Sequence, residues 1–117
     1  VVSDRFTDAT YAYQVGGRGL DETRFAALEQ WVHPHLQPDL TLIFDLDPVV
    51  AARRLAGTGN APDRFEREKA DFFERVRAAY LRRAAGDPAR VKVVDASRTP
   101  DEIWGELQEI VSRHCLK

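Results

Sequence analysis

The sequence predicts an α/β fold in three layers, with a parallel sheet covered by helices on both faces. Three short apolar or β-branched segments suit strands, at residues 1–3, 40–46 and 91–94. Helical patterns separate these segments, and the connections are long enough for parallel pairing. With 117 residues, 44% of them hydrophobic and 31% charged, the chain is expected to form one domain around one modest core.

Two helices are expected in the first third of the chain. A polar helical stretch covers residues 7–14, and a glycine cluster at 16–19 should interrupt the chain after it. The second helix is expected to begin after Asp21, a natural N-cap, because Leu20 and Phe25 have the spacing of a hydrophobic staple. Two prolines further along should end it.

The middle of the chain combines a buried strand with a flexible segment. Residues 40–46 (LTLIFDL) form a nearly continuous apolar run, which is typical of a strand covered on both faces. Asp47 and Pro48 are expected to cap a helix over residues 49–56. The glycine- and proline-containing stretch at 57–62 has the composition of a mobile loop.

The last third predicts a helix, a strand and a final helix. A long amphipathic helix is expected over residues 65–85, with aromatic side chains on one stripe and solvated arginines and glutamates elsewhere. A Gly-Asp-Pro sequence should stop it. After the last strand, Thr99, a proline and Glu102 have the spacing of a capping box that begins the final helix.

Charge and cysteine content exclude several classes of protein. The formal net charge is -2, so no basic surplus favours nucleic acid. No apolar run approaches the ~20 residues needed to cross a bilayer, and no export leader is seen before the first strand. Cys115, the single cysteine, cannot pair within the chain. We therefore expect a cytoplasmic protein that binds neither nucleic acid nor a membrane.

Asp4 and Arg5 follow the first predicted strand directly. In open α/β sheets, ligands collect at the carboxyl ends of strands, where a carboxylate can hold Mg²⁺ directly or through water. A guanidinium beside it matches the geometry of a phosphate. The two residues therefore indicate a phosphate-handling site. The alternative is a local ion pair or a cap for the following helix.

The stretch DRFTDATYAYQVGGRG, which begins at Asp4, resembles the corresponding segment of bacterial thymidylate kinases. The resemblance continues through PDLTLIFDL, through DRFERE and the phenylalanine-bearing helix after it, and through VVDAS. It covers essentially the whole chain, and the order and spacing of the segments make the combination specific. It implies a P-loop nucleoside monophosphate kinase fold and transfer of the ATP γ-phosphoryl group to dTMP, which gives dTDP.

The resemblance implies roles for five residues of the first segment. Asp4 looks like the acid near the Mg²⁺ site, and Arg5 like the arginine that binds the dTMP phosphate. Thr10 falls where the family has a small polar residue at the thymine edge. Tyr13 matches the aromatic under the deoxyribose, where it would crowd a 2'-hydroxyl, and Gln14 is expected to contact the same substrate. In the alternative interpretation Tyr13 is a packing residue and Thr10 a solvated hydroxyl.

Residues 57–67 resemble the lid that closes over ATP. A lid needs low intrinsic stability to move and basic residues to meet phosphate charge. Many bacterial members have arginines in the middle of the lid, where this chain has LAGT at residues 55–58. Arg64 is therefore the expected catalytic lid arginine, with Glu66 as an orienting partner in the substrate site. The alternative is a surface ion pair between them.

The remaining implied residues concern ATP. Arg54 resembles the residue that stacks on adenine, and the turn formed by Asp95, Ala96 and Ser97 should supply backbone on the opposite side. Such kinases bind the ATP phosphates through a Gly-x-x-x-x-Gly-Lys-Ser/Thr loop, and the chain contains no such stretch. We therefore expect residues 1–117 to be a single partial domain, the C-terminal part of a thymidylate kinase, inactive alone.

Two other interpretations stay open. One is a related kinase that acts on a deoxynucleoside or on another nucleoside monophosphate. The other is a non-catalytic truncated interaction module, which should form a stable dimer or a swapped assembly, whereas a bare fragment should aggregate. Because members of the resembled family are commonly homodimers, a homodimer is expected for the full-length protein.

Overall fold

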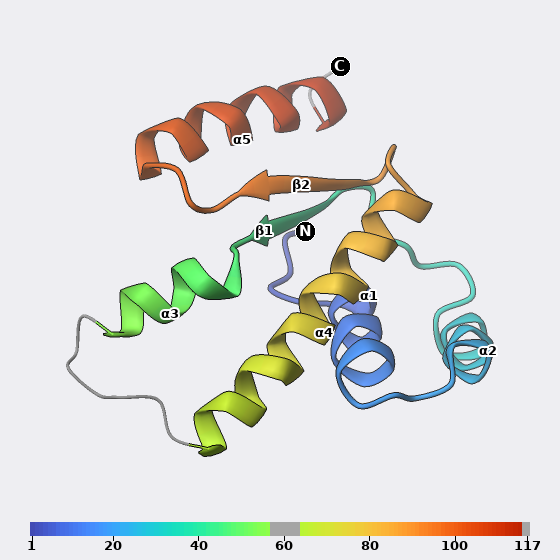
Figure 1. Ribbon diagram of the computed structural model, residues 1–117. Helices are drawn as coiled ribbons and strands as arrows, with labels where there is room; N and C mark the ends of the chain where they lie inside the picture. Colours follow the sequence, from blue (N-terminus) through green and yellow to red (C-terminus); the bar gives the residue numbers. More distant parts are fainter. Residues whose placement is uncertain (57–63, 116–117) are drawn as a thin grey trace.

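The computed structural model describes residues 1–56 and 64–115, and of residues 52, 55, 56 and 64–68 it describes the backbone alone. Figure 1 shows the strands in the middle of the molecule with helices on either side. The elements in chain order are α1 (Thr7–Thr10), the π-helix η1 (Tyr11–Gly17), α2 (Glu22–Val32), β1 (Thr41–Asp45), α3 (Pro48–Ala56), α4 (Arg64–Gly86), β2 (Val91–Asp95) and α5 (Pro100–Cys115).

The two strands β1 and β2 pair in parallel, with Thr41 opposite Val91 at the start of the register. Side chains alternate between the two faces of a sheet. On one face Val91 joins Ile43 and Ala84, a residue of α4, in a buried cluster. Val94, which points to the other face, is fully buried, and α5 runs along that side of β2 in Figure 1. The predicted parallel α/β arrangement is therefore confirmed.

The strand predicted at residues 1–3 is not formed. Val1 and Val2 are exposed, and in the part of the chain that the structure describes the sheet consists of β1 and β2. A strand is held by hydrogen bonds to a neighbouring strand. In the described structure β1 forms these hydrogen bonds with β2 and not with residues 1–3. The prediction of a third strand is wrong for this structure, because β-branched composition alone does not provide that neighbour.

The glycine cluster interrupts the chain later than predicted. Gly16 and Gly17 are the last residues of η1. A Cβ on Gly16 would collide with the Cβ of Ala79, and one on Gly17 would lie 2.5 Å from Cε2 of Phe72. These two glycines therefore allow η1 to approach α4 more closely than any larger residue would permit. Gly19, with a φ of 76°, makes the turn towards α2.

Three helices begin at the caps that the sequence predicts. The Asp21 carboxylate accepts a hydrogen bond from the backbone N–H of Arg24 (3.0 Å). The Asp47 carboxylate accepts one from the backbone N–H of Val49 (2.8 Å). The Thr99 hydroxyl accepts from the backbone N–H of Glu102 (3.3 Å) and donates to its carboxylate (2.9 Å). The second helix ends at Val32, before the first of the two prolines.

Within the described residues, the core forms two neighbouring clusters. One joins η1, α2 and α4 through the buried residues Tyr11, Ala12, Phe25, Val76 and Ala79. The other joins the sheet to the end of α4 through Ile43, Ala84 and Val91. Tyr80 packs against both clusters, so α4 is the element that connects the N-terminal helices to the sheet.

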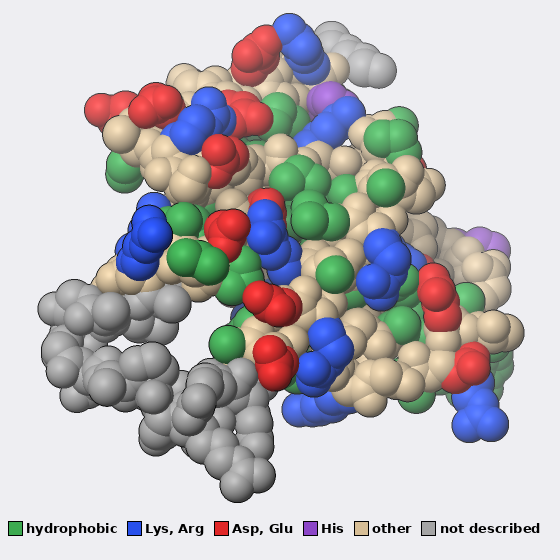
Figure 2. All heavy atoms as spheres, in the orientation of Figure 1, with side chains coloured by type: hydrophobic (Ala, Val, Ile, Leu, Met, Phe, Trp, Pro, Cys, Tyr) green, Lys and Arg blue, Asp and Glu red, His purple; other side chains and the backbone are tan. Residues whose placement is uncertain are grey.

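The surface combines mixed charge with exposed apolar side chains. Figure 2 shows basic and acidic side chains interspersed on the face that it presents. The side chains of Trp31, Trp104 and Phe44 are 83%, 61% and 55% exposed. The sequence predicts that both faces of the strand at residues 40–46 are covered. This prediction is wrong for Phe44 of β1, because its side chain is exposed. In the described part of the chain, no helix is long and apolar enough to cross a membrane.

Candidate functional site

Arg5 occupies a turn ahead of α1 in which its backbone is left-handed. Its φ is 65°, a region that bulky residues rarely adopt, and the Ser3 hydroxyl donates to its carbonyl oxygen (3.1 Å). The guanidinium carbon lies 5.0 Å from the centre of the Tyr13 ring, and Nη2 donates to the Tyr13 hydroxyl (3.3 Å). Backbone conformations of this kind cluster at binding sites. The structure thus brings together the two residues predicted to meet phosphate and deoxyribose.

Asp4 is exposed in the same turn, next to Arg5 in the chain. Among the described residues, no group of three or more histidine, cysteine or acidic side chains is placed to hold a metal ion. However, Mg²⁺ bound to nucleotide phosphates keeps several waters and needs only one or two carboxylates. A single exposed carboxylate beside an arginine fits that kind of site, and it does not fit a metal held by protein ligands alone.

Thr10 and Gln14 lie on the helical segment that also carries Tyr13. The Thr10 hydroxyl donates to the carbonyl oxygen of Phe6 (3.3 Å), and Gln14 Oε1 accepts from Nη1 of Arg18 (3.3 Å). Thr10 is exposed and Gln14 is half-buried. Both side chains therefore remain accessible to a ligand, and their predicted roles stay predictions.

The residues predicted to meet adenine come together at the carboxyl ends of the strands. Nη2 of Arg54, on α3, donates to the carbonyl oxygen of Ala96 (3.4 Å), just beyond β2. The Ala96 N–H donates to the carbonyl oxygen of Asp45 at the end of β1 (2.8 Å). The hydroxyl and the N–H of Ser97 both donate to Oδ1 of Asp95 (2.5 and 2.9 Å), which lowers the pKa of that carboxyl. This edge of a parallel sheet is where α/β folds bind ligands.

The predicted lid residues fall largely outside the described part of the chain. Residues 57–63 are not described, and neither are the side chains of Arg64 and Glu66. The backbone of residues 64–67 belongs to the first turn of α4. The predicted lid and the roles of Arg64 and Glu66 therefore stay predictions.

An arginine that the sequence analysis expects to be solvated is instead paired at the end of β1. Arg77 of α4 binds the Asp45 carboxylate with two nitrogens, at 2.7 and 3.0 Å, and lies 3.9 Å from Asp47. A hollow of about 430 Å³ between α3 and α4 is lined in part by Arg77, Asp47 and Glu74. The expectation that the arginines of this helix are solvated is thus wrong for Arg77, because Asp45 provides a fixed carboxylate.

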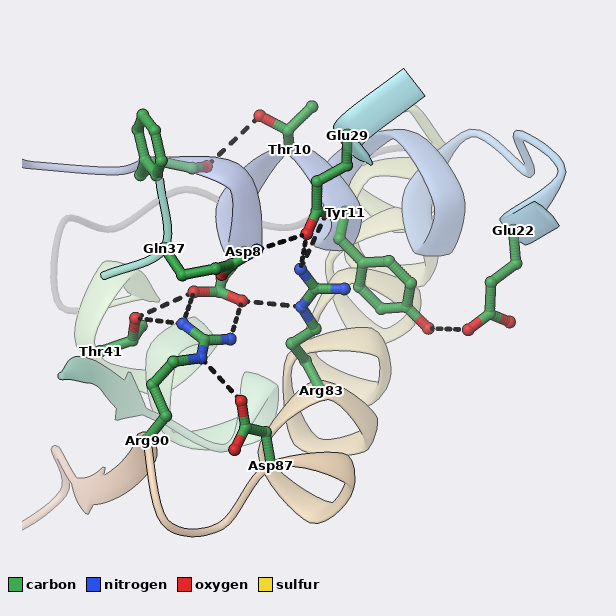
Figure 3. A network of polar contacts seen from close by, with 11 residues as sticks. Asp8, Thr10, Tyr11, Glu22, Glu29, Gln37, Thr41, Arg83, Asp87 and Arg90 are labelled. Carbon is green, nitrogen blue, oxygen red and sulfur yellow. Dashed lines mark hydrogen bonds and ion pairs between the residues drawn. The ribbon is translucent and has the colours of Figure 1, made fainter. Parts of the chain in front are cut away.

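A second paired group, centred on Asp8, was not found from the sequence (Figure 3). The Asp8 side chain is 4% exposed and accepts hydrogen bonds from Arg83 Nε (2.7 Å), from Arg90 Nη1 and Nη2 (both 2.9 Å) and from the Thr41 hydroxyl (2.9 Å). Burial raises the pKa of Asp8, but the hydrogen bonds from Arg90, Arg83 and Thr41 together outweigh it and leave the pKa at about 2.

The same group extends to two further helix ends. Nη2 of Arg83 donates to both carboxylate oxygens of Glu29 on α2 (3.0 and 2.9 Å), and Nε of Arg90 donates to Asp87 (2.7 Å). The group thus links α1 and α2 to the end of α4 and to the start of both strands. A polar hollow of about 390 Å³ lies beside it. Neither hollow is lined by Arg5 or Tyr13.

Comparison with known proteins decides the family. The family model described as Thymidylate kinase matches residues 1–106. The chain belongs to the thymidylate kinase family. It is 59% identical over 112 residues to the thymidylate kinase of Cupriavidus metallidurans, 61% over 107 residues to that of Chromobacterium violaceum and 56% over 108 residues to that of Halorhodospira halophila. The resemblance seen in the sequence is therefore confirmed.

These alignments differ in how much of each protein they cover. They include 92 to 96% of the chain but only 50 to 56% of the three thymidylate kinases. The chain thus spans about half the length of the curated relatives it matches. It contains the Arg5–Tyr13 pair and the Arg54–Ala96 contact, and it lacks the glycine-lysine loop that binds ATP phosphates in P-loop kinases.

Proposed function

We propose that this chain is the acceptor-binding part of a kinase that transfers the γ-phosphoryl group of ATP to dTMP and yields dTDP. The observation that carries the proposal is the pairing of Arg5 with Tyr13 ahead of α1. A guanidinium can donate two hydrogen bonds to a phosphate, and an aromatic ring can pack against the sugar of the same nucleotide. Membership of the thymidylate kinase family supports the same reaction.

On this proposal the acceptor is held by the segment around α1 and η1. Arg5 binds the dTMP phosphate, Tyr13 lies under the deoxyribose and Thr10 lies at the thymine edge. Gln14 contacts the same nucleotide. Phosphoryl transfer asks a protein mainly to position two anions in line and to neutralise charge. Asp4 would hold Mg²⁺, which when bound supplies positive charge to the donor phosphates.

The donor would lie at the carboxyl ends of β1 and β2. Arg54 would stack on adenine opposite the turn after β2, and the contact between Arg54 and Ala96 supports this placement. Arg64, oriented by Glu66, would stabilise the phosphoryl group during transfer.

The complete protein would have the fold of a P-loop nucleoside monophosphate kinase, with β1 and β2 as part of a larger parallel sheet and residues 57–67 as its lid. The chain alone would be inactive, because the loop that cradles the ATP phosphates is not in it. By the family resemblance, the complete protein would be a cytoplasmic homodimer.

A chimera tests the proposal. It joins this chain to the part of the Chromobacterium violaceum thymidylate kinase that the chain does not match; the two proteins are 61% identical where they align. We expect conversion of dTMP to dTDP that depends on Mg²⁺ and ATP, and no turnover by the chain alone. A preference for a deoxynucleoside or for another monophosphate would favour the related kinase. No turnover of any of them would refute the proposal.

A further inference from the structure

The ring of Tyr13 is contacted by two aromatic side chains of α4. Its centre lies 6.0 Å from that of Phe72, at an interplanar angle of 57°, and 6.4 Å from that of Tyr80, at 88°. Tilted and edge-to-face arrangements are the ones that aromatic pairs prefer. Arg5 adds a third contact to the same ring, 5.0 Å from its centre. The orientation of Tyr13 is therefore determined by α4 as much as by its own helix.

The two aromatic residues of α4 have little freedom of their own. Phe72 lies against Gly17, where a Cβ would come within 2.5 Å of its ring. Arg75 fixes this approach, because its Nε donates to the Gly17 carbonyl oxygen (3.2 Å) and its guanidinium carbon lies 5.9 Å from the centre of the Phe72 ring. Tyr80 packs against both core clusters. Closely packed interiors transmit displacement, so a change at either residue would reach Tyr13.

We infer that Phe72 and Tyr80 are positioning residues that set the orientation of Tyr13 and thereby the preference for a deoxyribose over a ribose. The inference rests on the proposed function, in which Tyr13 lies under the sugar. A ring that rejects a 2'-hydroxyl by steric contact must be held in place, because a small displacement makes room for one oxygen atom. Loss of either support should therefore change the ratio between two substrates rather than the rate with both.

The test compares dTMP with ribothymidine 5'-monophosphate in the chimera. Phe72→Leu and Tyr80→Leu should each lower the ratio of kcat/KM for dTMP to kcat/KM for the ribonucleotide by about tenfold, the range that one steric contact typically controls. Tyr80→Phe keeps the ring and should keep the ratio. Trp31→Leu is the control for loss of an aromatic ring, because Trp31 lies on α2 and is 83% exposed.

A loss of stability alone is controlled by Val94→Ala, a core change on the face of β2 that points away from the cluster around Tyr80, which should leave the ratio unchanged. If a leucine variant does not fold, the methionine variant at the same position, which fills a similar volume, replaces it. An unchanged ratio, or equal losses with both substrates, in an active chimera overturns the inference and leaves the proposed function standing. A chimera that fails to phosphorylate dTMP before any substitution overturns the proposed function itself.

Discussion

Arg5 is a long, charged residue in a backbone conformation, with φ at 65°, that such residues rarely adopt. The cost of this conformation is about 1–3 kcal/mol. In the chimera, Arg5→Ala should lower kcat/KM for dTMP by about 100-fold or more, because the acceptor phosphate loses a charged, two-pronged donor. Arg5→Lys should lower kcat/KM less than Arg5→Ala does, since an ammonium supplies the charge but cannot donate two parallel hydrogen bonds to the phosphate. Steady-state kinetics measure both.

The matched control for Arg5 is Arg82→Ala, which removes an exposed arginine near the end of α4. It takes away the same charge from the protein, so a purely long-range electrostatic effect would lower kcat/KM in both variants alike. Equal losses at the two positions would therefore contradict a direct contact between Arg5 and the phosphate.

Asp8 is the residue whose protonation should matter most for stability at low pH. Its pKa in the folded protein is about 2, against an ordinary value of 3.8, so the folded state binds fewer protons than the unfolded state between these values. The resulting stabilisation, about 2 kcal/mol, is fully present above the unfolded pKa and is lost as the pH falls through the folded pKa. Urea unfolding of the chimera at a series of pH values measures it.

Asp8→Asn should remove this part of the pH dependence. It should also lower the free energy of unfolding at neutral pH by about 3–5 kcal/mol, because Arg83 and Arg90 lose a buried charged partner. Asp71→Asn, an exposed position on α4, serves as the control and should change little. A variant at position 8 with the parent's pH profile would show that the stabilisation comes from elsewhere.

The helical elements are joined by glycine contacts, and these differ sharply in what they tolerate. Gly17→Ala should lower the free energy of unfolding by about 1–3 kcal/mol, because the new methyl group meets the Phe72 ring and pushes η1 from α4. Gly105→Ala in α5, where a Cβ meets nothing within 4 Å, should raise it by about 0.5–1 kcal/mol through helix propensity. Denaturant unfolding of the chimera gives both values, and destabilisation at both positions would contradict the argument.

Elements with local signals could be predicted from the sequence, and elements that need a distant partner could not. The caps at Asp21 and Thr99 each bind a backbone N–H three residues away, and the strands β1 and β2 are within one residue of the predicted bounds at every end. Residues 1–3 lack a neighbouring strand in the described structure, and η1 continues to Gly17 because α4 accommodates it.

The candidate site shows the same division. Arg5 and Tyr13 are eight residues apart and belong to one segment, so a family resemblance predicts both. Asp8 binds arginines 75 and 82 residues further along the chain, and no periodicity or spacing within its own helix indicates them. Likewise, the position of Arg77 in the helical pattern predicts a solvated side chain. Its partner Asp45 lies 32 residues earlier in the chain and is brought beside it only by the fold.

The molecule as a whole is less compact than a complete domain of its length. Its radius of gyration is 16.1 Å, whereas about 13 Å is expected for 117 residues in one compact domain. Large apolar side chains that a complete core would cover are exposed, among them Phe44 in the sheet and Trp104 on α5. Both observations agree with a structure that is completed by further chain.

The isolated chain should therefore associate in solution, whereas the chimera should not aggregate. Exposed apolar surface of this kind drives non-specific contact, so light scattering should find a broad mixture of assemblies and a hydrophobic dye should bind more strongly to the chain than to the chimera. A single stable dimer of the chain would instead favour the interaction module. A monodisperse monomer that unfolds cooperatively and binds no dye would contradict the argument, because the exposed surface at Phe44 and Trp104 would then need no covering chain.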